Sequence, residues 1–426
     1  MISNRRYELA RTGVKDPDML LTLVEQSFKE PALRWFISEA DQHHIVVEST
    51  EYEAALPARA GLPSRAGSRL DAVISLVPTG IACSIGGYAG DAAPVTALLA
   101  KAADVVVTNP NAVNASNFIH LPDEVLYTEG SGIDAFSRGE ISLHRSRGNR
   151  IGLIIERSPS ASVEHILNVT NAVRAVYGID VVDYVVTDQP IGTRCVRNPS
   201  GAYVGQVDAP ETLLEAARKL ISRGANAIAV TTNVQDLPSQ SYSDHFSGSH
   251  ANPVGGAEAI ISHLIVRTLG VPCAHAPLMN FKELTLAQAV VDARSAGELV
   301  SISGLACILI GLSRAPQLSA DIRGSRLAEE VRINDVTAVV APATALGSIP
   351  VLEALRRQIP VIAVQDNTTL LNVGSEQLGL DGIVHAANYV EAAGLILALR
   401  NGISPDTLTR PLRTLGRDNT TASLRT

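Results

Sequence analysis

The chain has 426 residues, of which 46% are hydrophobic and 18% are charged, and its formal net charge is −8. This composition is typical of a folded protein with a large core and excludes an intrinsically disordered chain. Aromatic residues make up only 4%. Because the basic residues form no stripe, we expect no nucleic-acid partner.

Residues 1–10 carry several charges and no apolar run, and no stretch of 18 or more apolar residues occurs. The sequence therefore predicts neither a signal peptide nor a membrane span. The four cysteines, Cys83, Cys195, Cys273 and Cys307, form no CxxC pair, which argues against a disulfide framework. We expect a cytoplasmic protein with no membrane partner.

The first segment, residues 1–66, differs from the rest of the chain. Asp16 and Pro17 have the positions of a helix cap and a first helical residue, and apolar residues at helical spacing follow them. The run 45–47 is long enough for one short strand, and a Pro- and Gly-containing linker covers 57–67. We expect a helical N-terminal extension.

From residue 70 onward, short β-branched runs alternate with Ala- and Leu-rich helical stretches. Apolar runs joined through helices are typical of buried parallel strands. The predicted strands are 72–77, 104–107, 151–155, 181–186, 227–230, 306–309, 336–340 and 361–364. The predicted helices are 94–103, 162–177, 209–223, 255–268 and 350–357. The predicted fold class is α/β, with mostly parallel sheets in two Rossmann-like lobes.

This alternation also predicts a division into four units. They are an N-terminal extension (1–66), a glycine-loop and histidine lobe (67–149 with 237–330), a βαβαβ lobe (150–236) and a C-terminal α/β unit (331–426).

Polar residues follow five of the predicted strands, at the ends where open parallel sheets bind ligands. Thr79, Asn109, Thr231 and Thr232 are the candidates for substrate binding there. Hydroxyl and amide groups of this kind suit a small, oxygen-rich ligand. Each of these residues, taken alone, equally suits a turn or a helix cap.

A glycine-rich loop, 80–91, follows the first predicted parallel strand and precedes a helix. Its backbone amides could bind a carboxylate or a phosphate, with Gly86, Gly87, Gly90 and Asp91 as substrate-binding candidates. The loop matches neither GxGxxG nor a P-loop, so we predict no dinucleotide and no other cofactor. A purely structural turn is the alternative.

Asn111 and Asn114 extend the polar segment that begins at Asn109 and are further candidates for substrate binding, or for holding the loop backbone. Glu129 and Asp134 are separated by glycines. They are candidates for proton transfer, or for binding an ammonium or guanidinium group. A solvated pair of carboxylates is the alternative.

Cys273 and His275 lie two residues apart, so an extended segment places both on one side. They could form a thiolate–imidazole pair or half of a metal site, while the neighbouring prolines equally favour a structural turn. His250, His263 and His275 are the candidate metal ligands, although no HExxH motif occurs.

Ser313 and Arg314 follow an apolar run and a glycine. At a pocket rim, Arg314 would make a bidentate contact with a substrate carboxylate, with Ser313 beside it. The GxSxG elbow of α/β-hydrolases is absent.

Over about residues 70–400 the chain resembles the uncharacterised family called domain of unknown function 3326. Several of the sequence segments described above occur together in that family. The strings that carry this resemblance are 78–80, 86–92, 109–115, 129–134, 253–264, 272–277 and 311–316. The resemblance implies where the site lies and implies no activity.

The region 338–362 resembles, more faintly, the last strand–helix–strand of the aspartate/glutamate racemase superfamily. At both strand ends the catalytic cysteine is missing, since Thr231-Thr232 and Pro342-Ala343-Thr344 occupy those positions. The two-cysteine mechanism of that superfamily therefore does not carry over.

The hypothesis that follows is an enzyme that transforms a small carboxylated or amino-acid-like metabolite by proton transfer, as an isomerase, lyase or hydrolase. Glu129, Asp134, Cys273 and His275 would be its catalytic residues. A non-catalytic metabolite-binding or regulatory protein and a metal-dependent hydrolase are the alternatives. We also expect a homo-oligomer.

Overall fold

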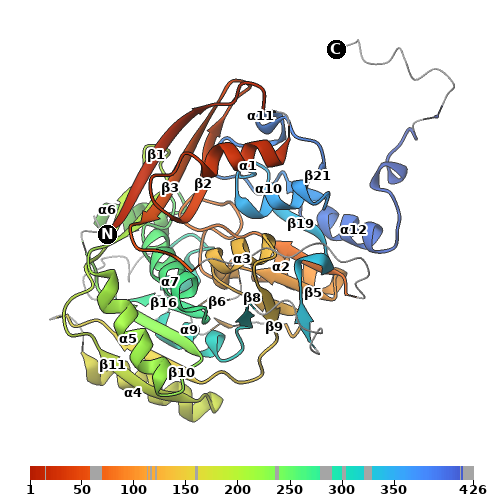
Figure 1. Ribbon diagram of the computed structural model, residues 1–426. Coiled ribbons are helices and arrows are strands. Elements are labelled where there is room, and N and C mark those ends of the chain that lie inside the picture. Colours follow the sequence, from red (N-terminus) through yellow and green to blue (C-terminus); the bar gives the residue numbers. More distant parts are fainter. Residues whose placement is uncertain are drawn as a thin grey trace.

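Two parallel sheets with helices on both faces form the body of the chain, and the N-terminus adds a small antiparallel sheet (Figure 1). The computed structural model describes residues 1–14, 16–57, 70–112, 114–115, 118–119, 122–158, 162–235, 239–278, 290–299, 304–320, 329–412 and 414–415. The predicted α/β class with parallel sheets is confirmed.

The larger sheet has six parallel strands in the order β21-β20-β19-β4-β5-β8. These strands are β4 (Ala72–Ser75), β5 (Val105–Thr108), β8 (Val125–Tyr127), β19 (Val336–Pro342), β20 (Val361–Val364) and β21 (Ile383–Ala386). The chain adds strands on one side of β4 and then, from β19, on the other. Such a reversal opens a crevice at the carboxyl ends of the strands.

The second sheet has four parallel strands in the order β11-β10-β14-β16. They are β10 (Ile151–Ile155), β11 (Val181–Val186), β14 (Ala227–Thr232) and β16 (Cys273–Pro277). Strand pairing crosses the predicted division into units. β4, β5 and β8 share a sheet with strands of the C-terminal unit, and β16 joins the sheet of the βαβαβ lobe.

Side chains of each buried strand alternate between two cores, because successive residues of a strand point to opposite faces. Val73 packs in the same core as α2 (Ala93–Ala102) and α12 (Tyr389–Arg400), whereas Ile74 packs in the core that contains α3 (Gly130–Ser137) and α10 (Ile349–Arg356). Apolar residues are therefore needed at every position, which explains the continuous apolar runs in the sequence.

In the second lobe, α4 and α9 contribute to one core and α5 and α7 to the other. The bounds are α4 (Val163–Tyr177), α5 (Pro210–Ser222), α7 (Gly255–Leu269) and α9 (Gly304–Leu312). The predicted strand 306–309 is wrong, because this run is the middle of α9. Leu305, Leu309 and Leu312 are buried at helical spacing, a pattern that a four-residue apolar run does not reveal.

The N-terminal extension is a three-stranded sheet with one helix. The prediction of a helical extension is therefore wrong, because most of this segment is β-strand. Its elements are β1 (Ile2–Ala10), α1 (Pro17–Glu25), β2 (Ala32–Ala40) and β3 (His44–Tyr52), with strand order β1-β3-β2. The helix cap is confirmed, since Asp16 accepts a hydrogen bond from the Met19 amide at 2.8 Å. In β2, Leu33, Trp35 and Ile37 are buried at every second position, which is strand periodicity.

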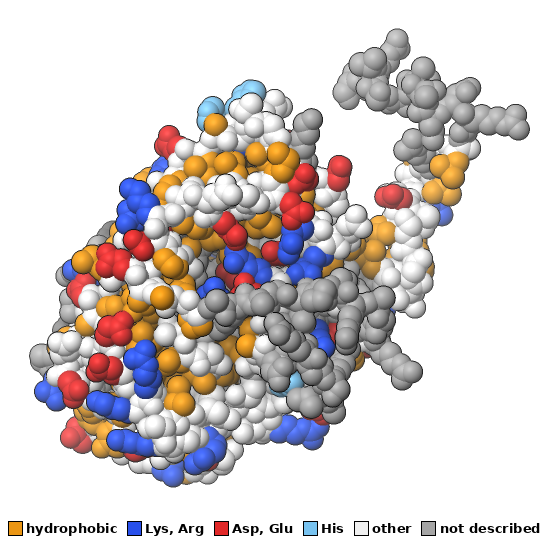
Figure 2. All heavy atoms as spheres, viewed as in Figure 1, with side chains coloured by type: hydrophobic (Ala, Val, Ile, Leu, Met, Phe, Trp, Pro, Cys, Tyr) orange, Lys and Arg blue, Asp and Glu red, His pale blue; other side chains and the backbone are white. Residues whose placement is uncertain are grey.

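Short elements complete the described chain. They are β6 (Asn114–Ala115), β7 (Phe118–Ile119), β9 (Ser142–His144), β12 (Thr193–Arg197), β13 (Tyr203–Val207), β15 (Val234–Gln235), β17 (Gln317–Ser319), β18 (Glu330–Val331), α6 (Ser239–Phe246), α8 (Ala296–Leu299) and α11 (Ser375–Leu378). None of the described helices is both long and apolar enough to cross a membrane. On the face seen in Figure 2, basic and acidic side chains are interspersed.

Helix α7 lies unusually close to β13, and glycine makes this approach possible. A Cβ atom at Gly256 would lie 2.6 Å from the carbonyl oxygen of Tyr203 and from backbone atoms of Val204. We expect Gly256→Ala to destabilise the fold by about 3 kcal/mol, because backbone atoms cannot yield as a side chain can. Thermal unfolding would measure this as a lower Tm.

The matched control is Gly394→Ala in α12, where nothing lies within 4 Å of the added Cβ atom. This variant should be as stable as the wild type or gain up to about 1 kcal/mol, because alanine is the better helix former. Equal effects of the two substitutions would contradict the close docking of α7.

Candidate functional site

A cavity of about 410 Å³ lies where the carboxyl ends of the two sheets meet. The larger sheet contributes Thr79, Asn109 and Glu129, and the second sheet contributes Thr231 and the strand β16. The N-terminal ends of α3, α7, α9 and α10 also line it. Several helix N-termini at one cavity create a positive potential that favours an anionic ligand.

Glu129 and His263 form a buried pair in the wall of this cavity, and they are only 4% and 6% exposed. Nδ1 of His263 lies 2.7 Å from Oε2 of Glu129. Glu129 is also the N-cap of α3, and it accepts hydrogen bonds from the amides of Ser131 at 2.9 Å and Gly132 at 2.5 Å. Burial raises the pKa of Glu129, but His263 and the bonds from Ser131 outweigh this effect, so its pKa is lowered.

This pairing fixes the imidazole of His263 in one orientation. Since Nδ1 faces the carboxylate of Glu129, Nε2 is the ring nitrogen that is directed away from it. A Cβ atom at position 130 would lie 2.9 Å from Nε2, so Gly130 is what leaves that nitrogen accessible. The carboxylate, the glycine and the imidazole thus form one unit, although sequence analysis considered His263 only as a metal ligand.

Asp134 on α3 and Glu258 on α7 line the same cavity as carboxyl groups without partners. Throughout the described chain, neither side chain receives a hydrogen bond or forms an ion pair. Burial raises the pKa of Asp134 to about 7, an effect that Arg138 and His263 reduce. Burial, and then the charge of Glu298, raises the pKa of Glu258 to about 8. Both groups can therefore exchange protons near neutral pH.

Arg34 brings a positive charge to the cavity from β2 of the N-terminal sheet. Its guanidinium lies 5.4 Å from the ring centre of Phe36, and within the described residues it has no hydrogen bond and no ion pair. Burial lowers the pKa of Arg34, an effect that the negative charge of Asp134 opposes. A guanidinium without a carboxylate partner is costly to bury, so this side chain is suited to an anionic ligand.

Cys273 and His275 both line the cavity, but they do not form the predicted thiolate–imidazole pair. Nε2 of His275 lies 2.8 Å from the hydroxyl of Thr232, and burial lowers the pKa of His275 to about 3, so the ring is neutral. Burial raises the pKa of Cys273 well above its usual range, which favours the thiol over the nucleophilic thiolate.

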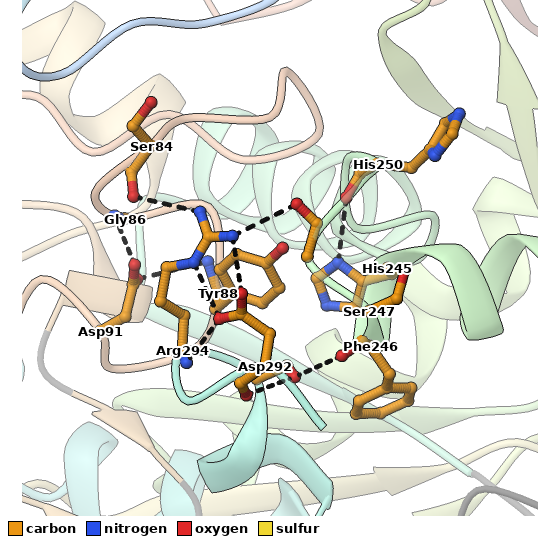
Figure 3. A network of polar contacts seen from close by, with 12 residues as sticks. Ser84, Gly86, Tyr88, Asp91, His245, Phe246, Ser247, His250, Asp292 and Arg294 are labelled. Carbon is orange, nitrogen blue, oxygen red and sulfur yellow. Dashed lines mark hydrogen bonds and ion pairs between the residues drawn. The ribbon is translucent and has the colours of Figure 1, made fainter. Parts of the chain in front are cut away.

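Several amides of the glycine-rich loop are bonded within the protein. The carboxylate of Asp91 accepts from the amides of Gly86 at 2.9 Å (Figure 3) and Tyr88 at 3.3 Å. A side chain at Gly87 would collide with the carbonyl oxygen of Cys83. Gly86, Gly87, Gly90 and Asp91 lie outside the cavity lining.

The glycine-rich loop is held against α6 and the segment 290–299 by a stack of three side chains (Figure 3). The guanidinium of Arg294 lies 4.7 Å from the ring centre of Tyr88, which stacks on His245 at 4.5 Å. Nε2 of His245 lies 2.9 Å from Oε2 of Glu298, and the Ala89 amide donates to Oε1 of Glu298 at 2.6 Å. These contacts place Glu298 in the cavity wall.

Arg314 and Ser313 do not reach the cavity. Arg314 forms an exposed ion pair with Asp123, and the Ser313 hydroxyl donates to the carbonyl of Ile310 at 2.7 Å. The run before them is α9 and not a strand, and both residues follow its C-terminal end, whereas its N-terminal end lines the cavity. The side chains of Asn111 and Asn114 lie outside the described residues.

The three histidines considered as metal ligands do not come together. His263 and His275 line the cavity, whereas His250 is exposed and bonds to Ser249. Within the part of the chain that the structure describes, no three His, Cys, Asp or Glu residues are grouped as a metal site. The histidine ligand set of the metal-dependent hydrolase alternative is therefore wrong.

The raised pKa of Glu258 makes the stability of the protein depend on pH. In the unfolded chain this carboxyl loses its proton near pH 4.5, but in the folded protein only near pH 8. Between these values unfolding releases a proton, so stability falls as the pH rises. Glu258→Gln should match the wild type near pH 5 and be more stable by about 2 kcal/mol or more at pH 8, since one pKa unit is worth about 1.4 kcal/mol.

Urea unfolding at the two pH values measures this difference. The control is Glu376→Gln, which replaces an exposed glutamate on α11 and should give the same small change at both. A gap between Glu258→Gln and wild type that does not grow with pH would contradict the buried, unpaired state of Glu258.

Comparison with known proteins places this site in a family. The model of the family described as "Protein of unknown function (DUF3326)" matches residues 72–409. The chain belongs to this family. It is also 37% identical to an uncharacterised lipoprotein of Synechococcus sp. over 345 residues, which cover 80% of this chain and 94% of the relative. No solved structure matches the chain.

The name of this relative corrects one expectation. A lipoprotein carries a covalent lipid that holds it at a membrane. A relative of this kind, matched over 80% of the chain, contradicts the cytoplasmic location expected from the sequence. A covalent lipid anchor needs no long apolar segment in the chain, so the absence of such a segment does not predict a cytoplasmic location.

Sequence reasoning missed the charged side chains Arg34, Glu258 and Glu298 of the cavity wall. The signal for Arg34 was a lone cation between apolar residues of a strand, in a segment that was interpreted as helical. The signal for Glu258 was its helix, since Glu258, Ser262 and His263 lie on one face of α7. Among the predicted residues, the fold brings Thr79, Asn109, Glu129, Asp134, Thr231, Cys273, His263 and His275 into the cavity wall.

Proposed function

We propose that the protein is an enzyme that acts on a small amino-acid-like carboxylate by proton transfer. One observation carries the proposal. The cavity contains a guanidinium and a carboxyl group that have no partner in the described protein, Arg34 and Asp134, beside an oriented imidazole, His263. Half-buried charges of both signs that have no partner among the described residues favour a ligand that supplies the opposite charges, as a zwitterion does.

The roles follow from the chemistry of each group. Arg34 binds the carboxylate of the ligand in a bidentate contact, and Asp134 accepts its ammonium group. Nε2 of His263, oriented by Glu129, takes the proton from the carbon next to the carboxylate, and the electron pair of that C–H bond moves into the carboxylate. Arg34 and the helix N-termini stabilise the added negative charge, and His263 then returns the proton.

The experiment is hydrogen–deuterium exchange. The purified protein in D₂O is incubated with a panel of amino acids, and proton NMR follows the loss of the Cα–H signal. Exchange of at least one amino acid is the expected result. Binding without exchange, detected as a thermal shift, would overturn catalysis and leave a metabolite-binding protein. Neither binding nor exchange across the panel would overturn the proposed ligand class as well.

A further inference from the structure

The roles proposed above leave one wall of the cavity without a function. Glu258 lies on α7, five residues before His263, which corresponds to an axial rise of about 7.5 Å. Its carboxyl group has neither a hydrogen bond nor an ion pair to any described residue. A half-buried carboxyl group that lines a cavity can find its partner there, so the cavity is where a partner for Glu258 would lie.

The surroundings of Glu258 contain a second carboxylate and two aromatic rings. Glu298 is held in place by His245 and by the Ala89 amide, and its charge acts on Glu258. The rings of Tyr242 and Phe246 stack with centroids 6.3 Å apart, and both residues line the cavity. Carboxylates together with aromatic faces attract a cation and repel an anion.

We propose that this wall is a subsite for a positively charged group at the far end of the ligand, so that the ligand is a basic amino acid with an ammonium or guanidinium side chain. The inference rests on the proposed function, because the α-carboxylate must be held by Arg34 for the side chain to reach Glu258. The separation between His263 and Glu258 is one that a side chain of the length of lysine or arginine can span.

The cation also resolves the electrostatic conflict at this wall. Two carboxyl groups share it, and the proton that Glu258 retains in the empty site prevents two negative charges from facing each other. A bound cation replaces that proton. Binding of lysine near pH 7 is therefore accompanied by proton release, whereas binding of an uncharged ligand of the same shape is not.

The test compares lysine with norleucine, which has the same carbon chain without the charged amine. Isothermal titration of the full chain is carried out near pH 7 in phosphate and in Tris, whose different ionisation enthalpies reveal any proton release. We expect lysine to bind at least about tenfold more tightly than norleucine, with a buffer-dependent heat for lysine alone. Glu258→Gln should lower the affinity for lysine at least about tenfold and leave that for norleucine unchanged.

Glu376→Gln is the matched control and should alter neither affinity. If the wild type binds norleucine as tightly as lysine, the subsite is refuted while the proposed function stands. The subsite is also refuted if Glu258→Gln binds both ligands more weakly while its Tm is unchanged. If the wild type binds neither these two ligands nor any other amino acid of the panel, the proposed function fails together with the subsite.

Discussion

His263→Asn should lower the rate of Cα–H exchange by about 10²- to 10⁴-fold, the usual contribution of a general acid or base. The asparagine amide can occupy the place of Nδ1 and keep the contact with Glu129, which is 2.7 Å in the wild type. The substitution therefore removes only the free Nε2. Ligand affinity should change little, because His263 acts on the proton and not on the carboxylate.

The same NMR measurement checks this result, together with a melting curve to confirm folding. His250→Asn is the control, since His250 is exposed and its ring lies against Ser249 and Asp244, away from the cavity. Its exchange rate should equal that of the wild type. An equal loss of rate in both variants, or full activity of His263→Asn, would exclude His263 as the base.

Arg34→Met should weaken binding of an amino acid by about 2–5 kcal/mol, which corresponds to roughly 30- to 5,000-fold in Kd. Methionine preserves the length and the apolar part of the side chain against Phe36 but removes the charge that pairs with the carboxylate. Because the guanidinium has no protein partner among the described residues, we expect the ligand-free variant to be at least as stable as the wild type.

The matched control is Arg314→Met, which removes the arginine that the sequence had favoured for this role. Arg314 pairs with Asp123 at the surface, so its loss should leave affinity unchanged. Titration calorimetry on the two variants separates these outcomes. Equal affinity of Arg34→Met and wild type would remove Arg34 from the site, and weaker binding by Arg314→Met would contradict its surface position.

Arg34 and Arg314 show how the prediction of a site residue depends on the secondary structure assigned to the run beside it. Arg314 follows an apolar run, whereas Arg34 interrupts one. The run before Arg314 is α9, and the run around Arg34 is β2. Short apolar runs do not distinguish a strand from a helix, so the sequence did not reveal that Arg34 rather than Arg314 lines the cavity.

The glycines of the loop 80–91 and Gly130 also differ in how far the sequence predicted their roles. The glycines of the loop were predicted to bind substrate, whereas the glycines after Glu129 were noted only as separating it from Asp134. In the structure, Asp91 of the same loop accepts from the amides of Gly86 and Tyr88, and Gly130 leaves room for the ring of His263. The role of Gly130 depends on a residue far away in the chain, which the local sequence does not reveal.

The sequence by itself determined the α/β class, most strands of the two parallel sheets, several of the helices and the polar strand ends of the cavity, because these depend on patterns that repeat every two to four residues. Only the tertiary structure decided which charged groups meet. Glu129 and His263, the closest pair of the site, are far apart in the chain, and Arg34 comes from a different sheet. Burial gives these groups their chemistry, and burial is a property of the packed chain rather than of any local segment.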